Sequence, residues 1–221
     1  NYLMPQTAIA LAEKEGRSGR DVLTAYVAGN EIAVRAAMAV HVLGEGGYFD
    51  EDGRGWQSTG SMGPIGTSIT AAKMLGLPTE QMIQTLVLGG TQLGGVYRPA
   101  GSNMGKTMMS GKAVANGIEN AYIARTGYVA GYRLYEDGLC FGSGIISPVH
   151  EIEKTTVGLG DVWETPNGDF CIYPTKKTYN TNMDALLHIL KSEQITFKDV
   201  DEIHILTAYG KAFLPKSVDA I

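Results

Sequence analysis

The feature that most constrains the fold is a run of small residues between Gly101 and Gly127. Small side chains recur there at intervals of three or four, at Ser110, Ala113, Gly117, Ala121 and Ala124. This spacing places them on roughly one face of a helix. Because none of these side chains is large, a neighbouring helix can approach that face closely. The stretch therefore predicts a tightly packed helical body.

A lysine stands at the start of this stretch. Glycine permits backbone conformations that a Cβ would forbid, and Gly101 and Gly105 precede Lys106. We therefore expect a flexible segment that holds Lys106 against a ligand at the mouth of the helical body. The alternative is a solvated loop lysine beside an ordinary core helix.

Composition narrows the class of protein. The chain has 221 residues and a formal net charge of −5, so it is long enough for a sizeable core and has no general attraction to nucleic acid or anionic membranes. None of its apolar runs is long enough to span a bilayer.

Cys140 and Cys171 fit no metal or redox spacing, which favours a reducing cytoplasm. Gly105-Lys106-Thr107 ends like a phosphate-binding loop, but Ala100 stands where the first glycine belongs. We expect no metal and no cofactor.

The N-terminal half reads as a series of helices. A short helix is expected over Thr7–Glu15, followed by a second whose N-cap is Ser18, with Asp21 completing a capping box. The segment 20–43 is apolar on nearly every face, which is typical of a buried helix, so Arg35 within it must be paired or lie at an edge.

The next segment, 44–66, is rich in glycine and reads as a loop of the kind that often carries function. After it, Ser61 or Thr67 is expected to cap a helix that runs through Leu75, and Thr79 begins another.

The pattern changes after residue 165. Residues 170–174 look extended, 183–190 form an amphipathic helical pattern, and Ile203 and Ile205 alternate with neighbours as in a strand. The sequence thus predicts a mainly α protein with a large all-helical domain at 1–165, followed by the start of a smaller α/β lid domain at 166–221.

The residues themselves favour an acidic small molecule as ligand. Two glycine-rich loops, at 55–60 and around Gly105, are joined by two helices. An ammonium such as that of Lys106 gives three donors and a full charge to a carboxylate. Backbone amides at a helix start after Gly60 would favour the same ligand. Nothing indicates a nucleophilic triad.

The chain resembles a known family over most of its length. Five segments match in order: LAEKEGRSGRDVLTAYVAGNEIAVR, GWQSTGSMGPIGTSITAAKMLGLPTEQM, LGGTQLGG, MGKTMMSGKAVANGIENAYIARTG, and Tyr173-Pro174 with Asp184-Ala185. They are similar to the 2-methylcitrate dehydratase (MmgE/PrpD) superfamily, which also contains cis-aconitate decarboxylase and iminodisuccinate epimerase. That resemblance implies a large helical domain, a smaller α/β lid, a homodimer, and metal-free chemistry on small di- or tricarboxylates.

The resemblance also implies site residues. Lys106 matches the family's lysine and is expected to stabilise a substrate carboxylate or enolate. Gln57 lies where the family commonly has histidine, Cys171 where it has lysine, and Asn180 where it has a second histidine. Glutamine and asparagine hydrogen-bond a substrate but are not bases near neutral pH. Lys106 and Gln57 are the predicted catalytic residues. The predicted substrate-binding set is Ser58, Thr59, Cys171, Lys176 and Asn180, in which Lys176, or its neighbour Lys177, restores the lost charge.

The favoured function is a lyase, a dehydratase or a decarboxylase, acting on a citrate- or aconitate-like acid by proton abstraction next to a carboxylate. An epimerase or isomerase on a similar acid is the first alternative. The second is a non-catalytic relative that binds an acidic metabolite or pairs with an active subunit, and a purely structural helical fragment is the third. The chain is short for the family, so we expect it to be incomplete.

Overall fold

The structure is a computed structural model that describes residues 2–40, 57–95, 103–134, 151–168, 170–174 and 179–205. The chain separates into two compact units, Asn1–Pro166 and Asn167–Ile221. Each unit is considered by itself below. The lid assignment for the second unit stays a prediction.

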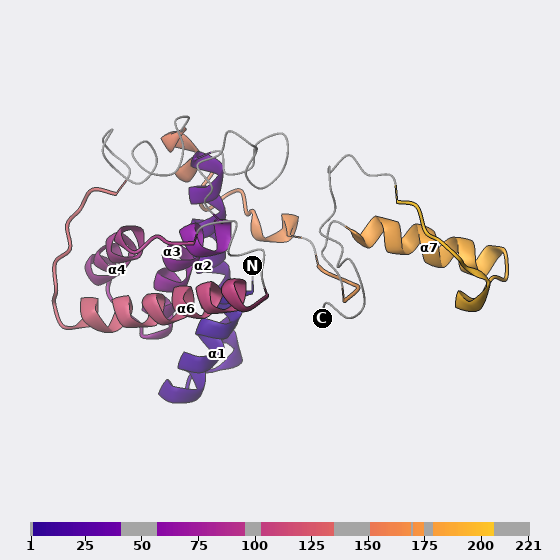
Figure 1. The fold of residues 1–221 in the computed structure, drawn as a ribbon. Coiled ribbons are helices and arrows are strands. Elements are labelled where there is room, and N and C mark those ends of the chain that lie inside the picture. The colour runs from indigo at the N-terminus through magenta and orange to yellow at the C-terminus, as the bar shows by residue number, and fades with distance from the viewer. Residues whose placement is uncertain are drawn as a thin grey trace. The chain divides into compact units, whose positions relative to one another are not determined.

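Five helices make up the first unit as far as it is described (Figure 1). They are α1 (Leu3–Glu15), α2 (Gly19–Ala39), α3 (Ser58–Met74), α4 (Thr79–Thr91) and α6 (Asn103–Arg125). The second unit contains α7 (Asn180–Ser192). Short 3-10 helices lie at Ile152–Thr155, Thr165–Asn167 and Phe197–Asp199.

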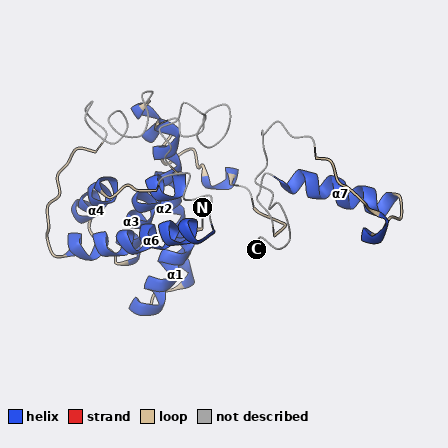
Figure 2. Ribbon diagram, in the orientation of Figure 1, coloured by secondary structure: helices blue, strands red, loops and turns tan. Residues whose placement is uncertain are grey.

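The mainly α fold class is confirmed. Figure 2 draws the described chain as helices and loops, and its described β pairing is an isolated bridge between Leu159 and Val162. The strand expected at Ile203 and Ile205 is wrong for these residues, which lie in irregular structure. A strand needs a partner for its ladder hydrogen bonds, and no described segment pairs with these residues. The amphipathic helix expected at 183–190 is confirmed as α7.

Helix α3 is the centre of the first unit, packed against α1, α2, α4 and α6. Three of these neighbouring helices, α2, α4 and α6, each contact α3 through a glycine. A Cβ added at Gly29 of α2 would lie 2.0 Å from Thr70 Oγ1, one at Gly89 of α4 would lie 2.7 Å from Ser68 Oγ, and one at Gly117 of α6 would lie 2.2 Å from Thr67 Oγ1. These distances are too short for a side chain, so backbones set the spacing of the helices.

The small-residue face predicted for 110–124 is confirmed. Ser110, Ala113, Ala121 and Ala124 are all buried on α6, as is Gly117. Polar groups also cross the contact between α3 and α6, because buried Asn120 donates from Nδ2 to Ser68 Oγ at 3.0 Å.

The helix boundaries are partly as expected. Ser18 and Asp21 form the predicted capping box at the start of α2. The first helix begins at Leu3, earlier than predicted, and α4 begins at Thr79 as predicted. The prediction that Ser61 or Thr67 caps α3 is wrong, because the helix begins at Ser58 and both residues are fully buried inside it.

Arg35 is paired, as its burial requires. Its Nε lies 3.6 Å from Glu31 Oε2, and its guanidinium donates to the carbonyl oxygens of Val157 and Val162 at 2.7 Å each. The segment after residue 151 is thereby fastened to α2.

Within the described ranges, no helix is long and apolar enough to cross a membrane. The same residues contain no cluster of three histidine, cysteine, aspartate or glutamate side chains placed to hold a metal ion.

Candidate functional site

A proline inside α3 shapes the site. Pro64 has no N–H, so the carbonyl of Gly60, four residues earlier, lacks its helical donor. The Gly94 N–H donates to that carbonyl instead, at 3.1 Å, and the Gln57 N–H donates to the Gly95 carbonyl at 2.9 Å. These two bonds tie the segment after α4 to the first turns of α3.

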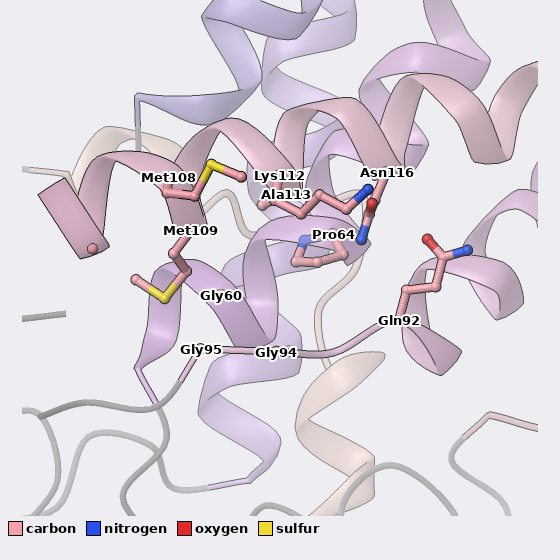
Figure 3. Close-up of a pocket in the computed structure, with 11 residues that line it drawn as sticks. Gly60, Pro64, Gln92, Gly94, Gly95, Met108, Met109, Lys112, Ala113 and Asn116 are labelled. Atoms are coloured by element: carbon pink, nitrogen blue, oxygen red, sulfur yellow. The ribbon is translucent and has the colours of Figure 1, made fainter. Parts of the chain in front are cut away.

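A cavity of about 360 Å³ lies beside this junction. Figure 3 shows its walls, which come from α3, the end of α4 with the segment after it, and α6. The lining residues are Gly60, Pro64, Gln92, Gly94, Gly95, Gly105, Met108, Met109, Lys112, Ala113 and Asn116. Ligand pockets in proteins begin at roughly 300 Å³, so the space suits a small molecule.

The α6 wall is one face of that helix. Gly105, Met108, Met109, Lys112 and Asn116 follow the spacing of three and four that a helix face requires. The lining set thus includes one cation and one carboxamide from successive turns. Lys112 forms no ion pair with any residue that the structure describes.

The third polar side chain of the cavity is Gln92, just after α4. Its Oε1 is buried and has no hydrogen-bond partner. An acceptor in this condition costs about 1 to 3 kcal/mol relative to a satisfied one. In Figure 3 the Gln92 oxygen is turned toward the side of the cavity where Lys112 and Asn116 lie.

Lys106 is placed differently from the expectation. The prediction of a flexible segment before the helix is wrong at Gly105 and Lys106, because both lie within α6. Lys106 is exposed and does not line the cavity, although Gly105 does.

Gln57 acts as the N-cap of α3. Its Oε1 accepts from the N–H of Thr59 at 2.6 Å and from that of Gly60 at 3.3 Å. Thr59 is buried and Ser58 is half-buried in the same turn. The Ser61 N–H donates to the Gln57 carbonyl. The amides of Thr59, Gly60 and Ser61 are therefore occupied, and the expectation that amides after Gly60 are open to an anion is wrong.

The remaining predicted site residues belong to the second unit. Asn180 Nδ2 donates to the Phe170 carbonyl at 2.9 Å, and exposed Cys171 contacts the Tyr173 carbonyl through Sγ at 3.3 Å. Lys176 and Lys177 lie outside the described residues. The structure gives no relation between these residues and the cavity of the first unit.

Two segments of the last matched motif do come together. The Tyr173 hydroxyl hydrogen-bonds to Asp184 Oδ1, and this bond, with some burial and the carboxylate's charge, raises the pKa of Tyr173. Both groups are at the surface of the second unit.

Comparison with known proteins identifies the family. The model of the MmgE/PrpD N-terminal domain matches residues 5–148, which is more than half of the chain. The chain belongs to the MmgE/PrpD family. The resemblance read from the sequence motifs is confirmed.

A curated relative is the cis-aconitate decarboxylase-like protein oryM of Aspergillus oryzae. It is 26% identical over 194 residues, which are 85% of this chain and 39% of the relative. This chain therefore spans well under half the length of that MmgE/PrpD protein, and the relative's name describes the relative alone.

Sequence reasoning missed Lys112, Asn116 and Gln92. A helical projection of α6 carries the signal for two of them, because Lys112 and Asn116 fall on the same face as Gly105. Gln92 has no such signal, since its position depends on the junction that Pro64 creates.

Proposed function

We propose that this chain is part of a lyase that removes a proton next to a carboxylate of a small di- or tricarboxylic acid, as a dehydratase or decarboxylase. Membership of the MmgE/PrpD family supports a lyase-type enzyme of acid metabolites. The observation that carries the proposal is the cavity between α3 and α6, in which Lys112 presents a cation without a described ionic partner.

The chemistry requires charge stabilisation. Removing a proton next to a carboxylate, or losing the carboxylate, builds negative charge that a fixed cation stabilises. Lys112 holds a substrate carboxylate in the cavity. Lys106, by resemblance, stabilises the developing charge from the first turns of the same helix, and Gln57 positions the start of α3 next to Gly60. Ser58, Thr59, Cys171, Lys176 and Asn180 remain proposed substrate contacts.

The test is proton NMR in D2O. The protein at its natural full length is incubated with citrate-, aconitate- and malate-like acids. We expect deuterium to enter one acid, or a new alkene or decarboxylated product to form. Lys106→Ala and Lys112→Ala are expected to lose this activity. Lys73→Ala, an exposed lysine in the last turn of α3, is the matched control and is expected to retain it.

A second candidate is a relative that binds an acid without turning it over. No imidazole or carboxylate is among the described residues that line the cavity, and this favours binding without proton removal. In the same experiment this candidate gives unchanged acid spectra together with saturable binding. An epimerase would instead exchange one proton and leave the carbon skeleton unaltered. If no acid is either bound or converted, the proposal is wrong.

We further propose a homodimer, as the family resemblance implies, and a location in the cytoplasm, which the cysteine spacing favours. The small-residue face of α6 is already buried against α3, so it is not offered as the dimer contact. Light scattering across a dilution series checks the assembly, and a constant monomer mass would end this part of the proposal.

A further inference from the structure

We infer that Met109 sets the length of the acid that the cavity admits, by closing the end of the cavity that lies away from Lys112 and Asn116. This inference rests on the proposed function, because it concerns the same cavity. It goes beyond that function by naming the residue that determines which members of a series of acids fit.

The cavity has two chemically different ends (Figure 3). On α6, Lys112 and Asn116 lie one turn apart and form a polar end. Met109 lies earlier on the same helix, with Gly60 and Gly95 beside it, and forms an apolar end. Because a helix rises about 1.5 Å per residue, the Cα atoms of Met109 and Asn116 are about 10 Å apart along the helix axis.

The Met109 thioether packs directly on glycine backbone. A Cβ added at Gly60 would lie 2.8 Å from Met109 Sδ, and one added at Gly95 would lie closer still. The thioether therefore occupies the space that side chains at these two positions would take. Since all three residues line the cavity, Met109 closes this end between α6 and the backbone opposite.

The backbone opposite Met109 cannot adjust the length of the cavity itself. A Cβ at Gly60 would lie 2.5 Å from the Gly94 carbonyl oxygen, and Gly95 has a φ of 93°, which favours glycine. The extent of this end therefore depends on the α6 side chain that faces the two glycines. An unbranched, adaptable thioether is suited to filling such an irregular gap.

The middle of the cavity favours the hydrocarbon part of a ligand. Pro64 follows Gly60 by one turn on α3, and Ala113 lies between Met109 and Asn116 on α6. Neither of these two side chains has a hydrogen-bonding group. An acid whose carboxylate is bound at the polar end therefore extends over Pro64 and Ala113 toward Met109, and the thioether limits its length.

The experiment is isothermal titration calorimetry of the full-length protein with succinate and with 2-alkylsuccinates whose alkyl chain grows from methyl to hexyl. Each buried methylene should raise the affinity of the wild-type protein about fourfold until the chain meets Met109, after which the affinity should fall.

Two variants of Met109 test the assignment. Met109→Ala removes the thioether, so the longest chain that still gains affinity should grow by about two or three carbons. Met109→Val keeps part of the packing and should give a smaller extension. Met104→Ala, at an exposed position on the same helix and outside the lining, is the control and should keep the wild-type limit.

A second measurement does not depend on whether a truncated variant folds. In wild-type protein with 13C-labelled methionine methyl groups, the Met109 signal is the one that disappears in Met109→Leu, a substitution that nearly conserves volume. This methyl group should show a nuclear Overhauser effect to the terminal methyl of the longest alkylsuccinate that binds.

The outcomes are distinguishable. Wild-type affinity that rises along the whole series, a limit that is unchanged in a folded Met109→Ala or Met109→Val protein, or no Overhauser effect at the Met109 methyl overturns this inference and leaves the proposed function standing. Failure to bind any alkylsuccinate, while an acid of the D2O experiment is converted, does the same. Failure to bind any of these acids, with no binding or turnover of the acids in D2O, overturns the proposed function as well.

Discussion

Glu31 and Arg35 lie one turn apart on α2 and both bind the backbone of the segment 157–165. Glu31 accepts hydrogen bonds from N–H groups of that segment, whereas Arg35 donates hydrogen bonds to its carbonyl oxygens. Glu31 accepts from the N–H groups of Glu164 and Thr165 at 3.0 and 2.7 Å. Arg35 donates to two carbonyls of that segment. Both side chains are buried, with exposed fractions of 3% each. A buried charge pair offsets its desolvation cost only where hydrogen bonds meet its charges, and here the backbone of the distant segment supplies them to the Glu31 carboxylate and to two nitrogens of the Arg35 guanidinium.

The first prediction concerns this pair and pH. Burial tends to raise the pKa of Glu31, but hydrogen bonds from the Thr165 hydroxyl and from two amides, together with the Arg35 charge, hold that pKa below its ordinary value of 4.5. When folding lowers the pKa of a carboxyl group, that group stabilises the fold at pH values above its unfolded-state pKa. This contribution to the free energy of unfolding is lost as the pH falls through the folded-state pKa.

Glu31→Gln is therefore expected to lower the free energy of unfolding by about 1 to 3 kcal/mol at pH 7. The difference from wild type should shrink progressively below pH 4.5. Urea unfolding at several pH values measures both effects. Glu13→Gln, an exposed position on α1, is the control and should change little. Equal stability of Glu31→Gln and wild type at pH 7 would contradict the account.

The second prediction compares two glycines on α6. Gly117→Ala forces a Cβ to within 2.2 Å of Thr67 Oγ1 and should destabilise the protein by about 1 to 3 kcal/mol. Gly111→Ala meets nothing within 4 Å and should stabilise by up to about 1 kcal/mol through helix propensity. Urea unfolding measures both variants, and a loss of stability in both would show that propensity arguments fail on this helix.

The third prediction tests the cap of α3. Because Gln57 Oε1 accepts from two amides of the first turn, Gln57→Ala should cost about 1 kcal/mol of stability even without ligand. Thermal unfolding of the ligand-free protein measures it, with Gln81→Ala as the comparison. An unchanged melting temperature would mean that the carboxamide has no structural part and serves only the proposed substrate.

The fourth prediction separates the two lysines of α6 kinetically. Lys112→Ala should raise KM by about tenfold or more, because a charge-assisted hydrogen bond to the substrate is lost. Lys106→Ala should lower kcat by about a hundredfold if it stabilises developing charge. Steady-state rates on whichever acid the NMR experiment identifies give both values. A Lys112 variant with wild-type KM would remove that lysine from the site.

Local signals predicted much of the first unit. The capping box at Ser18 and Asp21 is a contact within one turn, so the sequence carries it directly. The buried face of α6 follows from helical spacing, and the need to pair Arg35 follows from the cost of a buried charge.

The start of helix α3 could not be predicted in the same way, although the sequence predicts the helix itself through Leu75. Its sequence contains three glycines and Pro64, all of which count against a helix, so the sequence predicts a start later than Ser58. Tertiary packing decides the outcome, because small residues are what let neighbouring helices approach α3. That information lies in the partners Gly29, Gly89 and Gly117, which are remote in sequence.

The residues that line the cavity could likewise be predicted only in part from the sequence. The sequence predicts a flexible segment at Gly105 and Lys106. In the structure both residues are helical, and the helix face that lines the cavity continues from Gly105 to Lys112 and Asn116. In the second unit, the strand expected at Ile203 depends on a pairing partner, and sequence alternation alone does not provide one.

The backbone hydrogen bond from the Gly94 N–H to the Gly60 carbonyl has a consequence for how ligand preference can diverge among related proteins. On that side the cavity wall is glycine backbone, held because Pro64 leaves a carbonyl free. A substitution there cannot adjust the shape of the wall by degrees, since a Cβ at Gly60 would lie 2.5 Å from the Gly94 carbonyl oxygen. Changes of substrate are therefore expected to accumulate across the cavity, along Met108, Lys112 and Asn116, while the glycine side is inherited unaltered.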